Sequence, residues 1–288
     1  TNRPKERFGY SNTNYTLLGL IIEAVSGQTY EEFIQERLFE PAGMTESYYC
    51  DETAIRQKRA HGYDAVSPEE LIRAQYIDHT WPFAAGSLCS TVGDLAKWNE
   101  TVHGGGILRS GSYQAMVTPN ALDDGTPLRY AMGVGVTERS GLPVISHGGG
   151  INGFLSQLAW YPDDQLTVVV LQNSTGSPGP GELANTLAEL VLGPEPEIAA
   201  VPFQGDLGRY VGTYKGVGRG RDLEVEVQDV DGHMELRLDE QAWTPVYRGG
   251  ERWVRGNVQL TFVPSASGVD ELRFDSGGGH YILRRAGG

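Results

Sequence analysis

Apolar residues recur at helical spacing in the first third of the chain. This pattern extends over residues 12–26 and is followed by Gly27, so the stretch predicts a helix that ends at the glycine. A second helix is predicted from Thr29, because a threonine with a glutamate three positions later, Glu32, forms a capping box. The same pattern at residues 91–94 predicts the start of a third helix.

The pattern changes to alternation between residues 130 and 172, which is typical of strands. The turn at residues 162–164 predicts that the last two strands form an antiparallel hairpin. A final helix is predicted over residues 182–192, and the polar residues 49–82 predict long loops over a cleft. The predicted strands cover residues 130–136, 144–146, 154–161 and 166–172.

The character of the sequence changes again after residues 193–197, a Gly-Pro-Glu-Pro-Glu run that predicts an interdomain linker. Short apolar segments separated by glycine and aspartate follow, and they predict a small antiparallel barrel or sandwich. The glycines at 216, 218 and 220 lack the spacing of a dinucleotide-binding loop and are interpreted as a turn. The predicted strands cover residues 210–214, 223–228, 234–238, 242–247, 252–254, 258–263, 271–274 and 281–283.

Composition narrows the class of protein. With 39% apolar and 21% charged residues, the 288-residue chain is globular, and its formal charge of -14 argues against nucleic-acid binding. No apolar run approaches the ~20 residues of a transmembrane helix. Cys50 and Cys89 have no metal-type spacing and are interpreted as buried apolar residues rather than a disulfide. The histidines show no metal-ligand spacing, so neither a metal site nor a cofactor is predicted.

Tyr10 and Asn12 flank the predicted start of the first helix. Unpaired N–H groups at a helix N-terminus favour negative charge, which would help a phenolate at Tyr10 to act as a general base. The Asn12 amide could hold a substrate amide and a catalytic side chain together. The alternative is that Tyr10 is a core aromatic residue and that Ser11 or Asn12 is only the N-cap.

His147 is followed by Gly148, Gly149 and Gly150, just before a predicted strand. Successive glycines let a ligand lie against the backbone, whose N–H groups can bind a carbonyl oxyanion. The histidine can donate to a substrate carboxylate or to a catalytic tyrosine. The alternative is a flexible turn with an exposed His147. Ser87 and Ser90 are interpreted as a helix-entry loop rather than as nucleophiles.

Together these segments resemble the serine β-lactamase-like family, which includes class C β-lactamases, penicillin-binding-protein-like D-Ala-D-Ala carboxypeptidases, D-aminopeptidases and related esterases. The resemblance implies an α/β (α+β) fold, with an antiparallel sheet flanked by helices, over residues 1–193. It further implies a linker over residues 194–204 and a small all-β lipocalin-like barrel over residues 205–288. The matching segments are Phe8-Gly9-Tyr10-Ser11-Asn12, Phe39-Glu40-Pro41-Ala42-Gly43-Met44, Ala84-Ala85-Gly86-Ser87 and Ser146-His147-Gly148-Gly149.

By position, Tyr10 resembles the family's catalytic tyrosine and Asn12 its contact to the substrate amide. His147 stands where β-lactamases usually have lysine, which is more like the peptidase and esterase branches. Gly148 and Gly149 complete that triplet, and the N–H of Gly150 would form half of an oxyanion hole. The family's Ser-x-x-Lys nucleophile motif is absent, so the catalytic part is expected to be incomplete at its N-terminus.

The expected function is therefore acyl-serine transfer on D-amino-acid peptides, amides or esters, with the nucleophile on a separate or missing N-terminal fragment. The alternatives are a non-catalytic binding relative or inactive fragment, and a small-molecule carrier in which the final barrel is the functional part. Homo-oligomers are left open. The cell-wall branch of the family favours an extracytoplasmic site over a cytoplasmic one.

Overall fold

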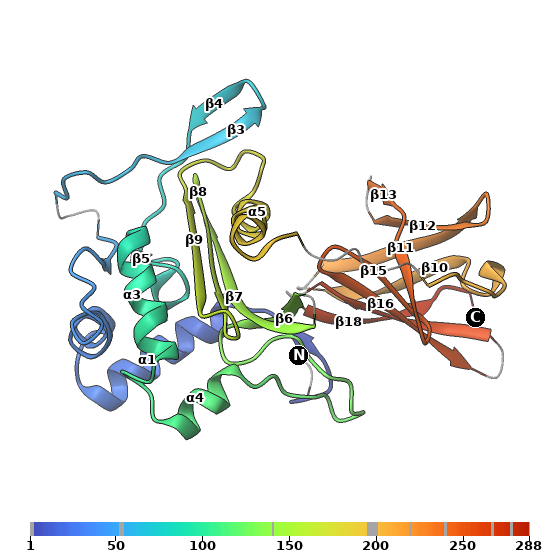
Figure 1. Ribbon diagram of the computed structural model, residues 1–288, viewed down its shortest axis with the longest axis horizontal. Coiled ribbons are helices and arrows are strands. Elements are labelled where there is room, and N and C mark those ends of the chain that lie inside the picture. Colours follow the sequence, from blue (N-terminus) through green and yellow to red (C-terminus); the bar gives the residue numbers. More distant parts are fainter. Residues whose placement is uncertain are drawn as a thin grey trace. The chain divides into compact units, whose positions relative to one another are not determined.

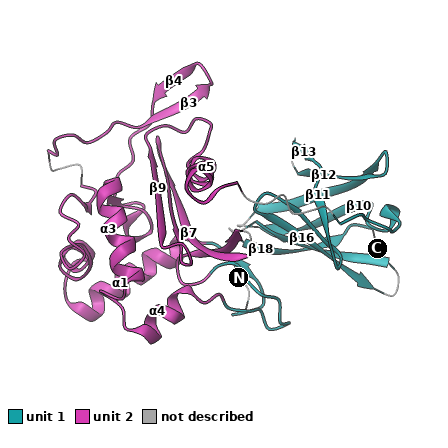
Figure 2. Ribbon diagram, in the orientation of Figure 1, with its two compact units in different colours: residues 1–10, 120–130, 197–288 teal, residues 11–119, 131–196 magenta. Residues whose placement is uncertain are grey.

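The chain divides into two compact units (Figures 1 and 2). Unit 1 comprises Thr1–Tyr10, Asn120–Tyr130 and Glu197–Gly288, and unit 2 comprises Ser11–Pro119 and Ala131–Pro196. The computed structural model describes residues 3–51, 55–139, 141–194, 201–218, 221–238, 241–265, 268–276 and 279–287. The predicted linker falls largely outside the described residues, and the boundaries at 193 and 205 stay a prediction.

A four-stranded antiparallel sheet forms the centre of unit 2, in the order β6-β7-β8-β9. The last two strands confirm the predicted hairpin, but residues 130–134 are not a strand. Gly133, at φ +81°, turns the chain there, and Ala131 donates its N–H to the Val134 carbonyl at 2.8 Å. The strands are β6 Gly135–Arg139, β7 Leu142–Ile151, β8 Phe154–Tyr161 and β9 Leu166–Gln172.

Helices surround this sheet, and two of them begin at the predicted caps, Thr29 and Thr91. Thr29 and Glu32 form a reciprocal capping box: Thr29 Oγ1 accepts from the Glu32 N–H, and Glu32 Oε2 accepts from the Thr29 N–H. At Thr91 only half of the box forms, because the Asp94 carboxylate accepts from Ser47 Oγ instead. The helices are α1 Asn12–Ser26, α2 Tyr30–Ile34, the π-helix Gln35–Phe39, the 3₁₀ helix Phe83–Ala85, α3 Val92–His103, α4 Ser110–Val117 and α5 Pro180–Leu192.

Two buried clusters hold unit 2 together. The first lies between the sheet and α5, where Ala184 and Ala188 on the helix pack against Val144, Tyr161 and Val168. Small residues let this helix approach the strands closely. The second cluster joins the first helices to α3, and its buried members are Tyr30, Ile34, Phe39, Ala42 and Met44.

Helix α1 leaves most of its apolar face exposed. Among the residues whose spacing predicted this helix, Leu18 is 51% exposed, Ile21 55% and Val25 83%. The helix packs instead through Gly19, where a Cβ would lie 2.4 Å from the Ala84 Cβ. An apolar stripe usually marks a buried face, but much of this stripe on α1 is exposed in the structure.

Residues 49–82 were predicted as loops, but they contain a hairpin formed by β3 Tyr63–Ser67 and β4 Glu70–Arg73. A second small sheet pairs β2 Tyr48–Tyr49 with β5 Leu88–Cys89. The hairpin was missed because each strand is short and mixes polar with apolar residues.

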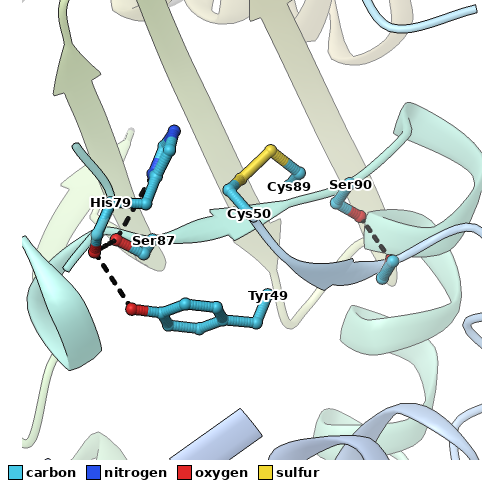
Figure 3. The surroundings of a disulfide bond; sticks show 7 residues. Tyr49, Cys50, His79, Ser87, Cys89 and Ser90 are labelled. Carbon is cyan, nitrogen blue, oxygen red and sulfur yellow. Dashed lines mark hydrogen bonds between the residues drawn. A yellow bond between two sulfur atoms is a disulfide. The ribbon is translucent and has the colours of Figure 1, made fainter. Parts of the chain in front are cut away.

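The interpretation of Cys50 and Cys89 as separate thiols is wrong, because they form a disulfide (Figure 3). Pairing of β2 with β5 places Tyr48 opposite Cys89, and the Cα atoms of the two cysteines lie 5.4 Å apart. Cys50 is buried, as predicted. The 39-residue separation concealed the pairing, because it depends on a contact between two-residue strands.

Unit 1 is a curled antiparallel sheet in the order β13-β12-β11-β10-β18-β17-β16-β15-β14. The short strand β1 Phe8–Gly9 pairs with β18. Arg129 binds the Asp275 carboxylate on β17 with 2.6 Å between Nη2 and Oδ1, which attaches residues 120–130 to the sheet. The strands are β10 Gly212–Gly218, β11 Arg221–Val230, β12 His233–Leu238, β13 Gln241–Trp243, β14 Val246–Gly249, β15 Arg252–Arg255, β16 Val258–Ser265, β17 Gly268–Asp275 and β18 Gly279–Arg285.

One buried cluster fills the inside of this sheet. The rings of Tyr214 on β10 and Phe262 on β16 lie 5.7 Å apart, although β18 and β17 separate these strands in the sheet. The curl therefore brings distant strands onto a shared core. The predicted strand at residues 242–247 splits into β13 and β14, and Gly216 and Gly218 lie within β10 rather than in a turn. Gly220 lies outside the described residues.

His103 makes unit 2 sensitive to acid. Its ring stacks on Trp160 with 5.1 Å between ring centroids, and its Nδ1 lies 2.8 Å from Tyr113 Oη. Burial lowers the pKa of His103 to about 4. The unfolded chain, with a histidine pKa near ~6.5, binds this proton first as the pH falls, so the folded state loses stability between those values.

The expected loss between pH 7 and pH 4 is about 1 to 2 kcal/mol, since the side chain is only partly buried and solvent screens part of its charge. Urea unfolding at both pH values measures it. The His103→Gln variant is expected to lose less stability on acidification than the parent chain. Equal losses in the two proteins would show that His103 does not cause the effect.

Candidate active site

Tyr10 connects β1 to α1 and is half-buried. Its ring meets Tyr130 edge-on, with 6.0 Å between centroids, and Phe8 stacks on the same Tyr130 at 5.2 Å. Residues 8 to 10 thus form a small aromatic group in unit 1. The ring of Tyr10 is fixed by packing, as a positioned general base requires.

Asn12 is the first residue of α1 and its side chain is exposed. Ser11 occupies the N-cap position with extended dihedral angles, φ −147° and ψ 121°, yet its side chain makes no capping hydrogen bond. The Ser11 side chain therefore does not occupy the first-turn N–H groups of α1, although the Asn14 N–H donates to the Ser11 carbonyl at 3.2 Å. No acidic residue lies in that first turn, so the positive end of the helix dipole is not neutralised there.

His147 and the three glycines lie inside β7, not before a strand or in a flexible turn. Strand β6 begins at Gly135 opposite Ser146, so β7 pairs only with β8 from residue 147 onward. Among the described residues, the stretch of β7 from Gly148 to Ile151 consequently has a strand partner on one edge only. This stretch of backbone is the part of the central sheet that a substrate could approach.

The register of the β7–β8 hairpin indicates which N–H groups face that free edge. The two-residue turn Asn152-Gly153 is closed by the pair of Ile151 and Phe154, which is a hydrogen-bonded pair in a hairpin of this length. Pairs alternate along the strands, so the N–H groups of Gly150 and Gly148 point away from β8. The N–H of Gly150, the expected oxyanion donor, is thus directed to the free edge.

Two of these glycines also leave room for side chains of the neighbouring strand. A Cβ at Gly148 would lie 2.9 Å from Gln157 Oε1, and a Cβ at Gly149 would lie 2.5 Å from Ser156 Oγ. Larger residues would push these side chains aside and disturb the strand. The glycines therefore serve both strand packing and access to the backbone.

His147 is partly buried on this strand. Burial lowers the pKa of His147, and a hydrogen bond with the backbone of Gly148 opposes that effect in part. The imidazole is therefore neutral at pH 7 and can both donate and accept a hydrogen bond.

Helix α1 contacts the turn just before β6 through Tyr15. The Tyr15 hydroxyl lies 3.3 Å from the position of a Cβ on Gly133, two residues before Gly135, which pairs with Ser146. Asn12 lies one helical turn before Tyr15, and His147 directly follows Ser146. The structure thus joins the elements that carry Asn12 and residues 147–150 within unit 2, while Tyr10 belongs to unit 1.

The β3–β4 hairpin is clamped to the other end of β7, a feature that the sequence analysis missed. Gly153, at φ +72°, packs so closely that a Cβ there would lie 2.5 Å from the Ala74 Cβ and 2.6 Å from the Gly62 carbonyl carbon. Asn152 Nδ2 donates to the Gln75 carbonyl at 3.1 Å. The Asn-Gly pair in the sequence is a hairpin signal that could have placed this turn.

Ser87 is not a nucleophile in this structure, in agreement with its interpretation as part of a loop. Its side chain is fully buried, and Oγ donates to the His79 carbonyl at 2.7 Å (Figure 3). Tyr49 Oη donates to the same carbonyl at 3.0 Å. These bonds hold the loop beside the disulfide.

Within the part of the chain that the structure describes, no helix combines the length and the apolar character needed to cross a membrane.

Comparison with known proteins shows the family to which the chain belongs. A family model described as Beta-lactamase matches residues 1–193. The chain is 28% identical to the D-aminopeptidase of Brucella anthropi over 190 residues, which cover 66% of this chain and 36% of that protein. It is 24% identical to the D-aminopeptidase of Brucella ovis over 260 residues, which cover 86% of this chain and 49% of that protein.

Among solved structures, the octameric penicillin-binding protein homologue from Pyrococcus abyssi is similar, with a TM-score of 0.59 and 26% identity. The match covers 98% of this chain and 66% of that one. The chain spans about half or less of the length of these curated relatives.

Proposed function

Because the chain belongs to the beta-lactamase family, we propose that it is part of a serine hydrolase that transfers acyl groups from D-amino-acid peptides, amides or esters. The D-aminopeptidase relatives support this class of substrate. The observation that carries the proposal is the free edge of β7, where the Gly150 N–H points outward three residues after a neutral His147.

In this mechanism Tyr10 takes the proton from a serine hydroxyl and later delivers it to the leaving group. The Gly150 N–H and the N–H of the serine itself stabilise the oxyanion of the tetrahedral intermediate. Asn12 holds the substrate amide. His147, neutral at pH 7, donates a hydrogen bond to a substrate carboxylate.

The serine comes from a segment outside these 288 residues, because the sequence contains no Ser-x-x-Lys. Two features support a further segment. The apolar face of α1 is exposed, and within the described residues β9 has no strand on its outer edge. A segment that covered both would bury Leu18 and Ile21 and pair the open backbone of β9.

The curled sheet of unit 1 is proposed to be a lipocalin-like barrel that accompanies the catalytic part. Its interior is filled by buried residues such as Tyr214 and Phe262, which disfavours the alternative of a small-molecule carrier. The octameric relative supports homo-oligomer formation. The Cys50–Cys89 disulfide supports an extracytoplasmic location, because disulfides persist in oxidising compartments.

A second candidate is a non-catalytic relative that keeps the cleft to bind a peptide or acyl ligand. The absent Ser-x-x-Lys favours it. Retention of Tyr10, Asn12 and His147 together favours the enzyme, since binding alone does not require a general base.

A fluorophosphonate probe with denaturing intact-mass spectrometry distinguishes the two. We expect no label on the 288-residue chain, and one label per molecule on a longer native form that carries Ser-x-x-Lys. That form should also hydrolyse D-amino-acid p-nitroanilides, and its Ser→Ala variant should do neither. A longer native form without Ser-x-x-Lys, or one that takes no label, would establish the binding protein instead.

A further inference from the structure

The β3–β4 hairpin is a rigid arm on unit 2. It projects beyond the ends of β8 and β9 (Figure 1). Its base is fixed by the close packing of Gly62 and Gly153. One of its edges is occupied: Tyr63 on β3 bridges Ser174 in parallel and donates its N–H to the Asn173 carbonyl at 3.1 Å.

The other edge, along β4, is open among the described residues, where β3 and β4 form a two-stranded sheet. The Ala74 N–H donates to the Gly62 carbonyl at 3.0 Å, so it points toward β3. Directions alternate along a strand, and therefore the N–H and C=O groups of Leu71 and Arg73 point to the open edge. These groups are positioned to pair with another strand.

The side chains on β4 also indicate a partner. Leu71 is 55% exposed and Ile72 is 48% exposed, at the end of an arm with little core of its own. A two-stranded hairpin alone is marginally stable, and exposed apolar edge strands are sites of strand pairing.

The sequence of this edge is complementary to itself. In an antiparallel pair of identical strands centred on Leu71, Leu71 lies opposite its own copy, and Glu69, the turn residue directly before β4, comes level with Arg73 of the other copy. The two-fold axis creates this ion pair twice, once on each side of the leucine pair. Centring on Ile72 would instead place Leu71 opposite Arg73, with no ion pair, so charge selects the register centred on Leu71.

We propose that β4 pairs with β4 of a second copy of this chain, in the antiparallel register centred on Leu71, to form a four-stranded sheet across a two-fold axis. In the single chain, Arg73 Nη2 lies 2.9 Å from His61 Nδ1, and the Glu69 carboxylate accepts from Ser67 Oγ at 3.4 Å. Both contacts are exposed and local, so the two side chains can turn to each other across the axis.

Such a contact is small, and we expect a weak dimer. The chain's net charge of -14 opposes association. A moderate salt concentration, where the Debye length is about 8 Å, limits this general repulsion.

Sedimentation of the 288-residue chain over a range of concentrations tests the proposal with matched charge variants. Glu69→Arg or Arg73→Glu alone places like charges opposite each other twice, and each should weaken dimerisation about tenfold or more. The double variant Glu69→Arg/Arg73→Glu restores opposite charges and should recover the parent affinity. A parent chain that stays monomeric, or a dimer indifferent to these changes, would overturn the proposal.

A cross-link tests the register. Both native cysteines are engaged in the disulfide, so an introduced cysteine supplies a single thiol. Leu71→Cys should form a disulfide dimer under mild oxidation, because opposed residues lie about 5.5 Å apart at Cα. Ile72→Cys, similarly exposed, should not, because its copies lie about 8 Å apart in this register. Equal cross-linking of the two variants would contradict the register.

Discussion

Replacing Cys50 and Cys89 together with alanine is expected to lower the free energy of unfolding of unit 2 by about 3 to 4 kcal/mol. The disulfide closes a loop between residues 39 positions apart, and opening that loop gives the unfolded chain more conformational entropy. The closed segment includes the β3–β4 hairpin and the loop of His79, and its two ends meet at the short strands β2 and β5.

Hydrogen exchange measured peptide by peptide checks this prediction, with unit 1 as the internal control. Peptides from unit 2 should lose protection by about a hundredfold or more, while peptides from the curled sheet should keep theirs. The reduced parent chain distinguishes the effect of losing the disulfide from the effect of truncating the buried Cys50 side chain, because it lacks the disulfide but keeps both sulfur atoms. A loss below about 1 kcal/mol in both proteins would show that strand pairing alone fixes this segment.

Sequence periodicity predicted the elements whose stabilising contacts are local in the chain. The capping box at Thr29, the β8–β9 hairpin and the final helix α5 are examples, because each depends on contacts within about a dozen residues. The approximate positions of the strands in unit 1 were also predicted, since segments rich in valine, leucine and tyrosine are separated there by glycine and aspartate turns.

The features that were missed depend on long-range contacts. The disulfide needs two-residue strands 39 positions apart to pair, and the position of the β3–β4 hairpin needs Gly62 to meet Gly153. The extent of β7 was underestimated because three glycines lower strand propensity. Pairing with β8 compensates for this low strand propensity. Gly148 and Gly149 also leave room for the side chains of Gln157 and Ser156 on β8.

For the candidate site, sequence supplied the residues but not the geometry. His147 was predicted before a strand, whereas its position inside β7 gives the Gly150 N–H a defined direction. The pKa of His147 could not be predicted either, because its lowering follows from burial on that strand. The role of Tyr10 stays a prediction.

Tyr10→Phe is expected to reduce kcat/KM by about 100-fold or more in a longer native form that carries the serine segment. The substitution removes only the hydroxyl, so the ring keeps its edge-on contact with Tyr130. Without the phenolate, nothing accepts the serine proton or returns it to the leaving group. KM should change little, because the hydroxyl acts on the nucleophile rather than on the bound substrate.

Steady-state kinetics with a D-amino-acid p-nitroanilide and labelling with the fluorophosphonate probe measure this effect together. Both rates should fall in parallel, because both require deprotonation of the serine. Tyr48→Phe is the matched control: Tyr48 loses the same hydroxyl on β2, while its ring can still lie under the guanidinium of Arg56, 4.5 Å away. If Tyr10→Phe kept near-parental kcat and probe labelling, another group would be the base, and Tyr10 would serve only to pack the start of α1.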